Sequence, residues 1–242
     1  MALKEIEYKE NQFQLSYELV NPTADRVLLI LHGWGSNKEI MKQAFGKTMP
    51  DFKHIYLDMP GFGKSSNEIV LTTVDYANIV QLFLDALSVR PQVAMGHSFG
   101  GKVSTLLDTP CLVLLSSSGV LVPKQSKVRL KIALFKILKP IKLDRLHQLF
   151  ISDDAKGMSH EMYETFKNVV NEDFSENFSK IRGKGVLFWG KSDTATPLWS
   201  GEKIAGLIEN SQFFPLDGDH FFFLKHKDFI AQTITKQCKG ID

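Results

Sequence analysis

The feature that most constrains the fold is a series of short, continuously apolar runs separated by stretches with helical periodicity. Continuous apolar character is typical of strands covered on both faces, whereas half-exposed strands alternate. The clearest helical stretch is residues 73–87, where apolar residues from Val74 to Leu87 cluster on one side. This pattern predicts an α/β fold with a mostly parallel sheet flanked by helices. The apolar runs are residues 27–31, 55–57, 92–95, 112–115, 185–189 and 212–214.

One segment, residues 119–182, interrupts this alternation with helical patterns and no clear core strand. Its first half, residues 124–147, contains nine Lys, Arg or His residues and one acid, Asp144, interleaved with apolar positions. Pro140 ends or kinks the helix expected there. We therefore predict a helical lid at 119–182 on a core formed by residues 1–118 and 183–242.

Composition and charge narrow the class of protein. The chain has 242 residues, of which 43% are apolar, and its net charge of +2 gives no reason to expect nucleic-acid binding. The first ten residues are charged and lack the apolar core of a signal peptide. No stretch approaches the roughly 20 apolar residues that a membrane span requires. We expect a cytoplasmic protein without a transmembrane segment.

The two cysteines show neither a disulfide framework nor the spacing of a metal site. Cys111 begins an apolar run and Cys238 lies close to the C-terminus. We expect one buried thiol and one surface thiol. No metal or other cofactor is predicted.

The sequence GHSFG at residues 96–100 matches the pattern G-x-S-x-G, with Ser98 at its centre. A buried run at 92–95 leads into it and a short helical run at 101–107 follows, which is the strand–turn–helix setting of a nucleophile elbow. Such a turn strains the backbone at the serine and leaves no room for side chains two residues before or after it. We predict that Ser98 is a nucleophile and that the Phe99 N–H, at a helix N-terminus, binds an oxyanion.

A second sharp turn, HGWG at residues 32–35, follows the first apolar run. Loops at the carboxyl ends of parallel strands surround the ligand site in open α/β sheets. The N–H of Trp34 can therefore point to the same place as that of Phe99. Two converging N–H groups form an oxyanion hole.

A serine hydroxyl needs a base to take its proton and an acid to orient that base, in the chain order Ser, Asp or Glu, His. Asp193 lies in the loop after the apolar run 185–189, whereas three other acids fall in the predicted lid with no such strand before them. The three are Asp153, Asp154 and Asp173. Asp193 is accordingly the predicted acid.

His220 follows the last apolar run, in a loop that can reach back to Ser98. His226 lies inside the next helical stretch, and His32 and His97 precede the acid in the chain. His220 is therefore the predicted base.

Taken together, these motifs resemble the α/β-hydrolase superfamily, and the resemblance covers nearly the whole chain. HGWG, DMPGFGKS, GHSFGG, WGKSDTATP and GDH occur in that order. The resemblance implies a serine hydrolase with the triad Ser98, Asp193 and His220, acting through an acyl-enzyme intermediate. Serine at position 98 argues against dehalogenases and epoxide hydrolases, which use Asp there.

Within the superfamily the chain is similar to two subgroups. One is the small microbial carboxylesterases, including methyl esterases of acyl-carrier-protein-linked esters. The other is the C–C bond hydrolases of 2-hydroxy-6-oxo-dienoates, which often carry Asn where His97 stands and Trp where Phe221 stands. That resemblance suggests Arg129, Arg145 and Phe221 as substrate-binding residues, with Arg182 as a further candidate. The sequence spacing does not show which of the arginines would bind the substrate carboxylate.

The leading hypothesis is hydrolysis of a small carboxylic ester. The alternatives are C–C bond hydrolysis with the same triad and a ligand-binding protein that kept the fold without catalysis. The expected partner is a small acyl substrate, and the cations of residues 124–147 suggest attraction of an anionic substrate or an acidic carrier protein.

Overall fold

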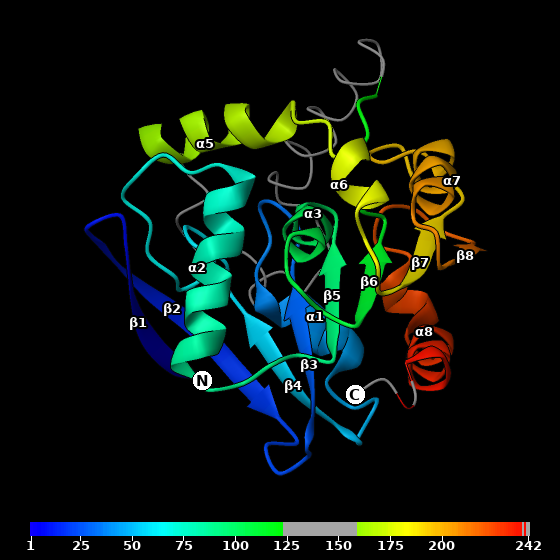
Figure 1. The fold of residues 1–242 in the computed structure, drawn as a ribbon, viewed down its shortest axis with the longest axis horizontal. Coiled ribbons are helices and arrows are strands. Elements are labelled where there is room, and N and C mark those ends of the chain that lie inside the picture. Colours follow the sequence, from blue (N-terminus) through cyan, green and yellow to red (C-terminus); the bar gives the residue numbers. More distant parts are fainter. Residues whose placement is uncertain (123–158, 239, 241–242) are drawn as a thin grey trace, which may run out of the picture.

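A computed structural model describes residues 1–122, 159–238 and 240 and contains one eight-stranded sheet. The spatial order is β1-β2-β4-β3-β5-β6-β7-β8; the β1–β2 and β2–β4 pairs are antiparallel and all others are parallel (Figure 1). This confirms the predicted fold class. The strands are β1 (Ala2–Tyr8), β2 (Asn11–Val20), β3 (Arg26–Leu31), β4 (Phe52–Leu57), β5 (Val93–His97), β6 (Cys111–Leu115), β7 (Lys184–Gly190) and β8 (Ser211–Leu216).

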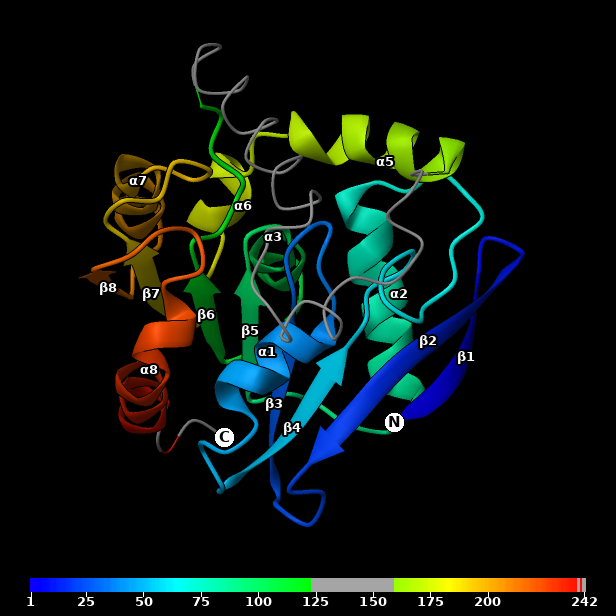
Figure 2. The ribbon, with the colours of Figure 1, turned by 180° about the vertical axis from the view of Figure 1, so that it is seen from behind.

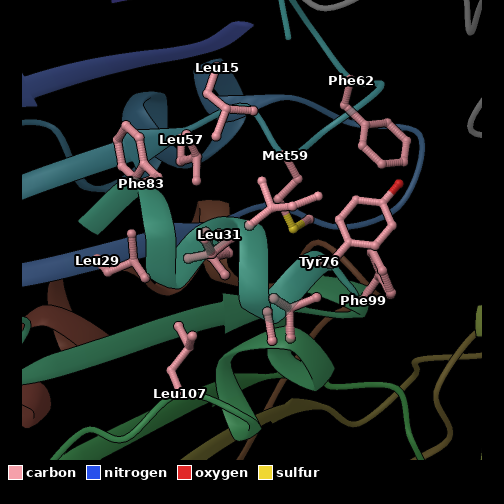
Figure 3. Packing of buried hydrophobic residues seen from close by; sticks show 14 of the residues in the cluster. Leu15, Leu29, Leu31, Leu57, Met59, Phe62, Tyr76, Phe83, Phe99 and Leu107 are labelled. Atoms are coloured by element: carbon pink, nitrogen blue, oxygen red, sulfur yellow. The ribbon is translucent and has the colours of Figure 1, made fainter. Parts of the chain in front are cut away.

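Helices cover both faces of the sheet, which explains the continuously apolar strands. On β3, Leu29 and Leu31 join a cluster with α2 and α3 (Figure 3), while Leu28 and Ile30 join a second cluster with α1 and α8. Figures 1 and 2 show these two pairs of helices on opposite faces of the sheet. Farther along the sheet, α6 and α7 pack on β6 and β7. The helices are α1 (Lys38–Phe45), α2 (Thr73–Ala86), α3 (Phe99–Thr105), α5 (His160–Val170), α6 (Ser175–Ser179), α7 (Leu198–Leu207) and α8 (Phe223–Gln237).

The six apolar runs correspond to strands β3 to β8, and α2 begins at the first residue of the predicted stretch 73–87. A capping box fixes that start, since the Thr72 and Asp75 side chains bond each other's backbone N–H groups. Val74 does not join the apolar side of this helix, because it is 53% exposed. The antiparallel hairpin of β1 and β2 was not predicted. It forms the edge of the sheet, and its strands alternate between buried and exposed residues instead of being continuously apolar.

The expectation of two free thiols is wrong. Cys111 at the start of β6 and Cys238 at the end of α8 are both buried and form a disulfide. The cysteines are 127 residues apart, and only the packing of α8 against the sheet brings them together. Spacing in the chain therefore could not reveal the pair.

The predicted lid is described only at its ends, because residues 123–158 lie outside the described part, and the division into core and lid stays a prediction. In its second half, α5 lies across the carboxyl ends of the central strands, above α2 and α3 (Figure 1). Phe166 and Val169 of α5 join the apolar cluster of α2 and α3, and the Leu71 N–H donates to Thr165 Oγ1 at 2.9 Å. The described end of this segment thus packs on the core.

Candidate active site

Ser98 lies at the sharp turn between β5 and α3, with a φ of 50°. A non-glycine residue in this region is strained, as expected at a nucleophile elbow. A Cβ atom on Gly96 would lie 2.2 Å from the carbonyl oxygen of Gly100, and one on Gly100 would lie 2.5 Å from that of His32. Glycine is therefore required two residues before and two residues after the serine.

Asp193 and His220 meet at the carboxyl edge of the sheet, in the loops after β7 and β8. His220 Nδ1–H donates to Asp193 Oδ2 over 2.7 Å, and both side chains are buried. Asp193 Oδ1 accepts the N–H groups of Ala195 and Thr196, at 2.8 and 2.9 Å. Burial alone would raise the pKa of Asp193, but the charge and hydrogen bond of His220 and the Thr196 bond hold it below its usual value. The aspartate is thus kept ionised and oriented toward the histidine.

His97 connects the histidine loop to the serine turn. Its Nε2–H donates to the main-chain carbonyl of His220 over 3.0 Å, and the two rings lie 4.5 Å apart. Burial, followed by the nearby His220, lowers the pKa of His97 well below 6.5, so its ring is neutral. Because His97 immediately precedes Ser98, this bond fixes the position of His220 relative to the elbow.

A pocket that is partly open to solvent contains Ser98, Trp34 and Phe99 in its wall. Phe99 is the first residue of α3, so its N–H is one of the unpaired donors at the helix N-terminus. The Trp34 ring packs at 5.4 Å from that of Phe99 and 5.3 Å from that of Phe166. The structure thus brings the two predicted oxyanion residues and the serine to one cavity.

Comparison with known proteins identifies the fold. A family model described as alpha/beta hydrolase fold matches residues 26–107. Over its full length the chain resembles a thermophilic esterase from Thermogutta terrifontis, with a TM-score of 0.76, 16% identity and coverage of 100% of this chain and 99% of the other. The protein has the α/β-hydrolase fold.

Two bacterial relatives match this chain over most of its sequence. The pimeloyl-[acyl-carrier protein] methyl ester esterase of Proteus mirabilis is 23% identical over 88% of this chain and 93% of its own. The uncharacterized hydrolase YugF of Bacillus subtilis is 25% identical over 83% of this chain and 85% of its own. These relatives support a hydrolase and leave its substrate open.

Of the three predicted substrate-binding residues, the structure describes Phe221. Arg129 and Arg145 lie outside the described residues. Phe221 is absent from the pocket wall and packs instead against the rings of His220 and His97, at 5.6 and 5.4 Å. Its role in binding substrate stays a prediction.

Two residues in the pocket wall of this hydrolase were missed by sequence reasoning. Lys102 of α3 and Glu172, after α5, form an ion pair of 2.7 Å. Lys102 follows the GHSFGG motif directly, but nothing in the sequence shows which acid it meets 70 residues later. Within the part of the chain that the structure describes, no group of three or more His, Cys, Asp or Glu side chains could hold a metal ion.

Proposed function

We propose that the protein is a serine hydrolase that cleaves a small carboxylic ester through an acyl-enzyme intermediate on Ser98. The observation that carries this proposal is the 2.7 Å bond between His220 Nδ1 and Asp193 Oδ2, in a loop tied by His97 to the serine turn. A buried histidine that a carboxylate orients is the kind of base that activates a serine hydroxyl. A binding module needs no such arrangement.

The chemistry follows from these positions. His220 Nε2 takes the Ser98 proton as the serine oxygen attacks the ester carbonyl, while Asp193 stabilises the imidazolium that forms. The N–H groups of Phe99 and Trp34 hold the oxyanion of the tetrahedral intermediate. When the intermediate collapses, His220 returns the proton to the leaving alcohol. Water, activated by the same histidine, then attacks the acyl-enzyme and releases the carboxylic acid and free Ser98.

The choice of an ester over a C–C bond in a dienoate acid rests on the charge of the pocket. A dienoate substrate carries a carboxylate that needs an available cation. Among the described residues of the pocket wall, Lys102 is the cation, and Glu172 already neutralises it. A neutral ester fits this pocket better, and six relatives of the chain, including that of Proteus mirabilis, are named as methyl ester esterases.

The cationic segment 124–147 lies outside the described residues, so attraction of an anionic substrate or an acidic carrier protein stays a prediction.

The test combines covalent labelling with substrate turnover. Wild type should react with a fluorophosphonate probe and hydrolyse p-nitrophenyl esters, and Ser98→Ala should abolish both. Ser179→Ala, which removes an exposed hydroxyl on α6, serves as the matched control and should behave as wild type. Faster turnover of a 2-hydroxy-6-oxo-dienoate than of esters would favour the C–C hydrolase. If neither labelling nor turnover depends on Ser98, the remaining hypothesis is a ligand-binding protein without catalysis.

We also keep the proposal of a cytoplasmic location, with one argument against it. The described residues include no helix long and apolar enough to cross a membrane. The Cys111–Cys238 disulfide, however, is of a kind that rarely persists in the cytosol. Counting the free thiols of protein extracted from the cell in the presence of an alkylating agent tests the location. Two free thiols are expected for a cytosolic protein and none for an exported one.

A further inference from the structure

A single ion pair stands in the largely apolar pocket beside Ser98. Lys102 lies one turn along α3 from the serine, and its N–H donates to the Ser98 carbonyl at 3.4 Å. Its ammonium group pairs with Glu172, and both residues line the pocket. The apolar part of the same wall comes from residues such as Phe99, Phe166 and Val169. The pair is therefore placed where the acyl part of an ester bound at Ser98 would pass.

The hydrogen bonds show which atom of the pair remains available. Lys102 Nζ donates to the Val169 carbonyl at 2.5 Å and to Glu172 Oε2 at 2.7 Å, and it lies 4.7 Å from the centre of the Phe174 ring. The ammonium group is thus surrounded by two hydrogen-bond acceptors and an aromatic ring, and the lysine side chain is only 2% exposed.

Glu172 Oε2 also accepts the Thr73 hydroxyl. Glu172 Oε1, in contrast, has no donor within the described part of the chain, and this side chain is 27% exposed. The open position at the pair is therefore an acceptor.

We propose that Glu172 selects neutral acyl groups that carry a hydrogen-bond donor, such as a hydroxyl, which Oε1 accepts. This inference rests on the proposed ester hydrolysis at Ser98. A substrate carboxylate is disfavoured, because Lys102 is already neutralised and the free oxygen of the pair is itself negative. A buried ion pair is often no more stabilising than well-packed apolar side chains, so stability alone does not account for this pair.

The first experiment needs no variant. Methyl hexanoate, its 3-hydroxy and 5-hydroxy derivatives, the matching methoxy derivatives and monomethyl adipate share one acyl length and differ in donor and charge. For at least one hydroxyl position, wild type should show a kcat/KM about tenfold above that of methyl hexanoate, as a charge-assisted hydrogen bond supplies. The matching methoxy ester, which lacks the donor, should lose this gain, and monomethyl adipate should be the poorest substrate.

Two double variants then locate the acceptor. Lys102→Met with Glu172→Gln removes both charges and keeps a carbonyl oxygen near the Oε1 position. Lys102→Met with Glu172→Leu removes the oxygen as well. We expect the first to retain part of the hydroxyl preference and to accept monomethyl adipate at least severalfold better, and the second to lose the preference altogether.

Equal turnover of hydroxy and methoxy esters by wild type would overturn the proposal, as would a hydroxyl preference that survives in the Glu172→Leu double variant. Either result leaves ester hydrolysis intact if methyl hexanoate is still cleaved in a Ser98-dependent way. If wild type does not cleave methyl hexanoate in a Ser98-dependent way, the proposed function itself is refuted. Thermal unfolding of both double variants ensures that only folded protein is compared.

Discussion

Two buried ion pairs form at the same edge of the sheet, each from an aspartate in the loop after a parallel strand. Asp193 follows β7 and pairs with His220, while Asp58 follows β4 and pairs with Lys38. The distances are nearly equal, at 2.7 and 2.6 Å. Position in the fold and ion-pair distance therefore do not separate a chemical pair from a structural one.

The partners and the surroundings make the difference. Asp58 is enclosed by the Lys38 ammonium, the Lys38 N–H at 2.7 Å and the Lys64 N–H at 3.1 Å. Asp193 is instead bonded to Thr196, a residue of the pocket wall. A lysine side chain generally keeps its proton at neutral pH. A histidine side chain can gain or lose a proton at a pH close to neutral. The Lys38–Asp58 pair thus holds the start of α1 to the loop after β4, whereas the Asp193–His220 pair is the one that we propose moves a proton.

The largest expected effect separates the pairs by catalysis. Asp193→Asn should lower kcat by about 10⁴-fold, the typical result when the orienting acid of a Ser-His-Asp triad is lost. Asp228→Asn, at an exposed position on α8, is the control and should retain full activity. Steady-state kinetics on a p-nitrophenyl ester measures both. A decrease of less than tenfold for Asp193→Asn would mean that this pair is structural, like the other.

The second expected effect separates the pairs by stability. Asp58→Asn leaves the Lys38 ammonium buried without its counter-ion and should cost about 3–5 kcal/mol of unfolding free energy. The kcat per folded molecule should stay within a few-fold of wild type. Urea unfolding together with active-site titration tests this, and a large fall in kcat with unchanged stability would give the Lys38–Asp58 pair a catalytic role.

A third prediction concerns the buried histidine beside each pair. Burial is the main cause that lowers the pKa of both His32 and His97 below 6.5. His32 Nε2 accepts the Met59 N–H at 3.1 Å, so the neutral ring is the folded form. The unfolded chain takes up these protons first as the pH falls. Stability is therefore complete above about pH 6.5 and should decrease below it, by at most about 1.4 kcal/mol per pH unit for each histidine.

Urea unfolding between about pH 7.5 and about pH 5.5 measures this slope. His97→Gln should reduce it, whereas His160→Gln, at an exposed position, should not. An unchanged slope in His97→Gln would show that the ring is already protonated in the folded protein.

The smallest expected effect concerns the bond between His97 and the His220 carbonyl. His97→Leu removes this donor and should lower kcat by up to about tenfold with little change in KM, because one hydrogen bond that positions the base is lost. His97→Gln, which retains an N–H, should recover part of the rate. Equal rates in the two variants, or a shift in KM alone, would show that His97 only fills space.

The sequence predicted the parts of the fold with a one-dimensional signal. The six inner strands appear as continuous apolar runs because helices cover both of their faces. Ser98, Asp193 and His220 could be nominated because each follows such a strand in a fixed order. The β1–β2 hairpin was not predicted because its strands are half exposed. Val74 was wrongly assigned to the buried side of α2 because apolar spacing does not show which part of a helix the core covers.

What the sequence by itself determined is the strand order along the chain, the glycines that the elbow requires and the residue types of the site. Only the tertiary structure decided which distant residues meet: Cys111 with Cys238, His97 with the His220 carbonyl, and Lys102 with Glu172. The physical reason is that such pairs lie 70 to 127 residues apart and are joined by the packing of whole helices and strands. A local sequence pattern indicates which stretches of the chain are buried and leaves the partner of each residue unspecified.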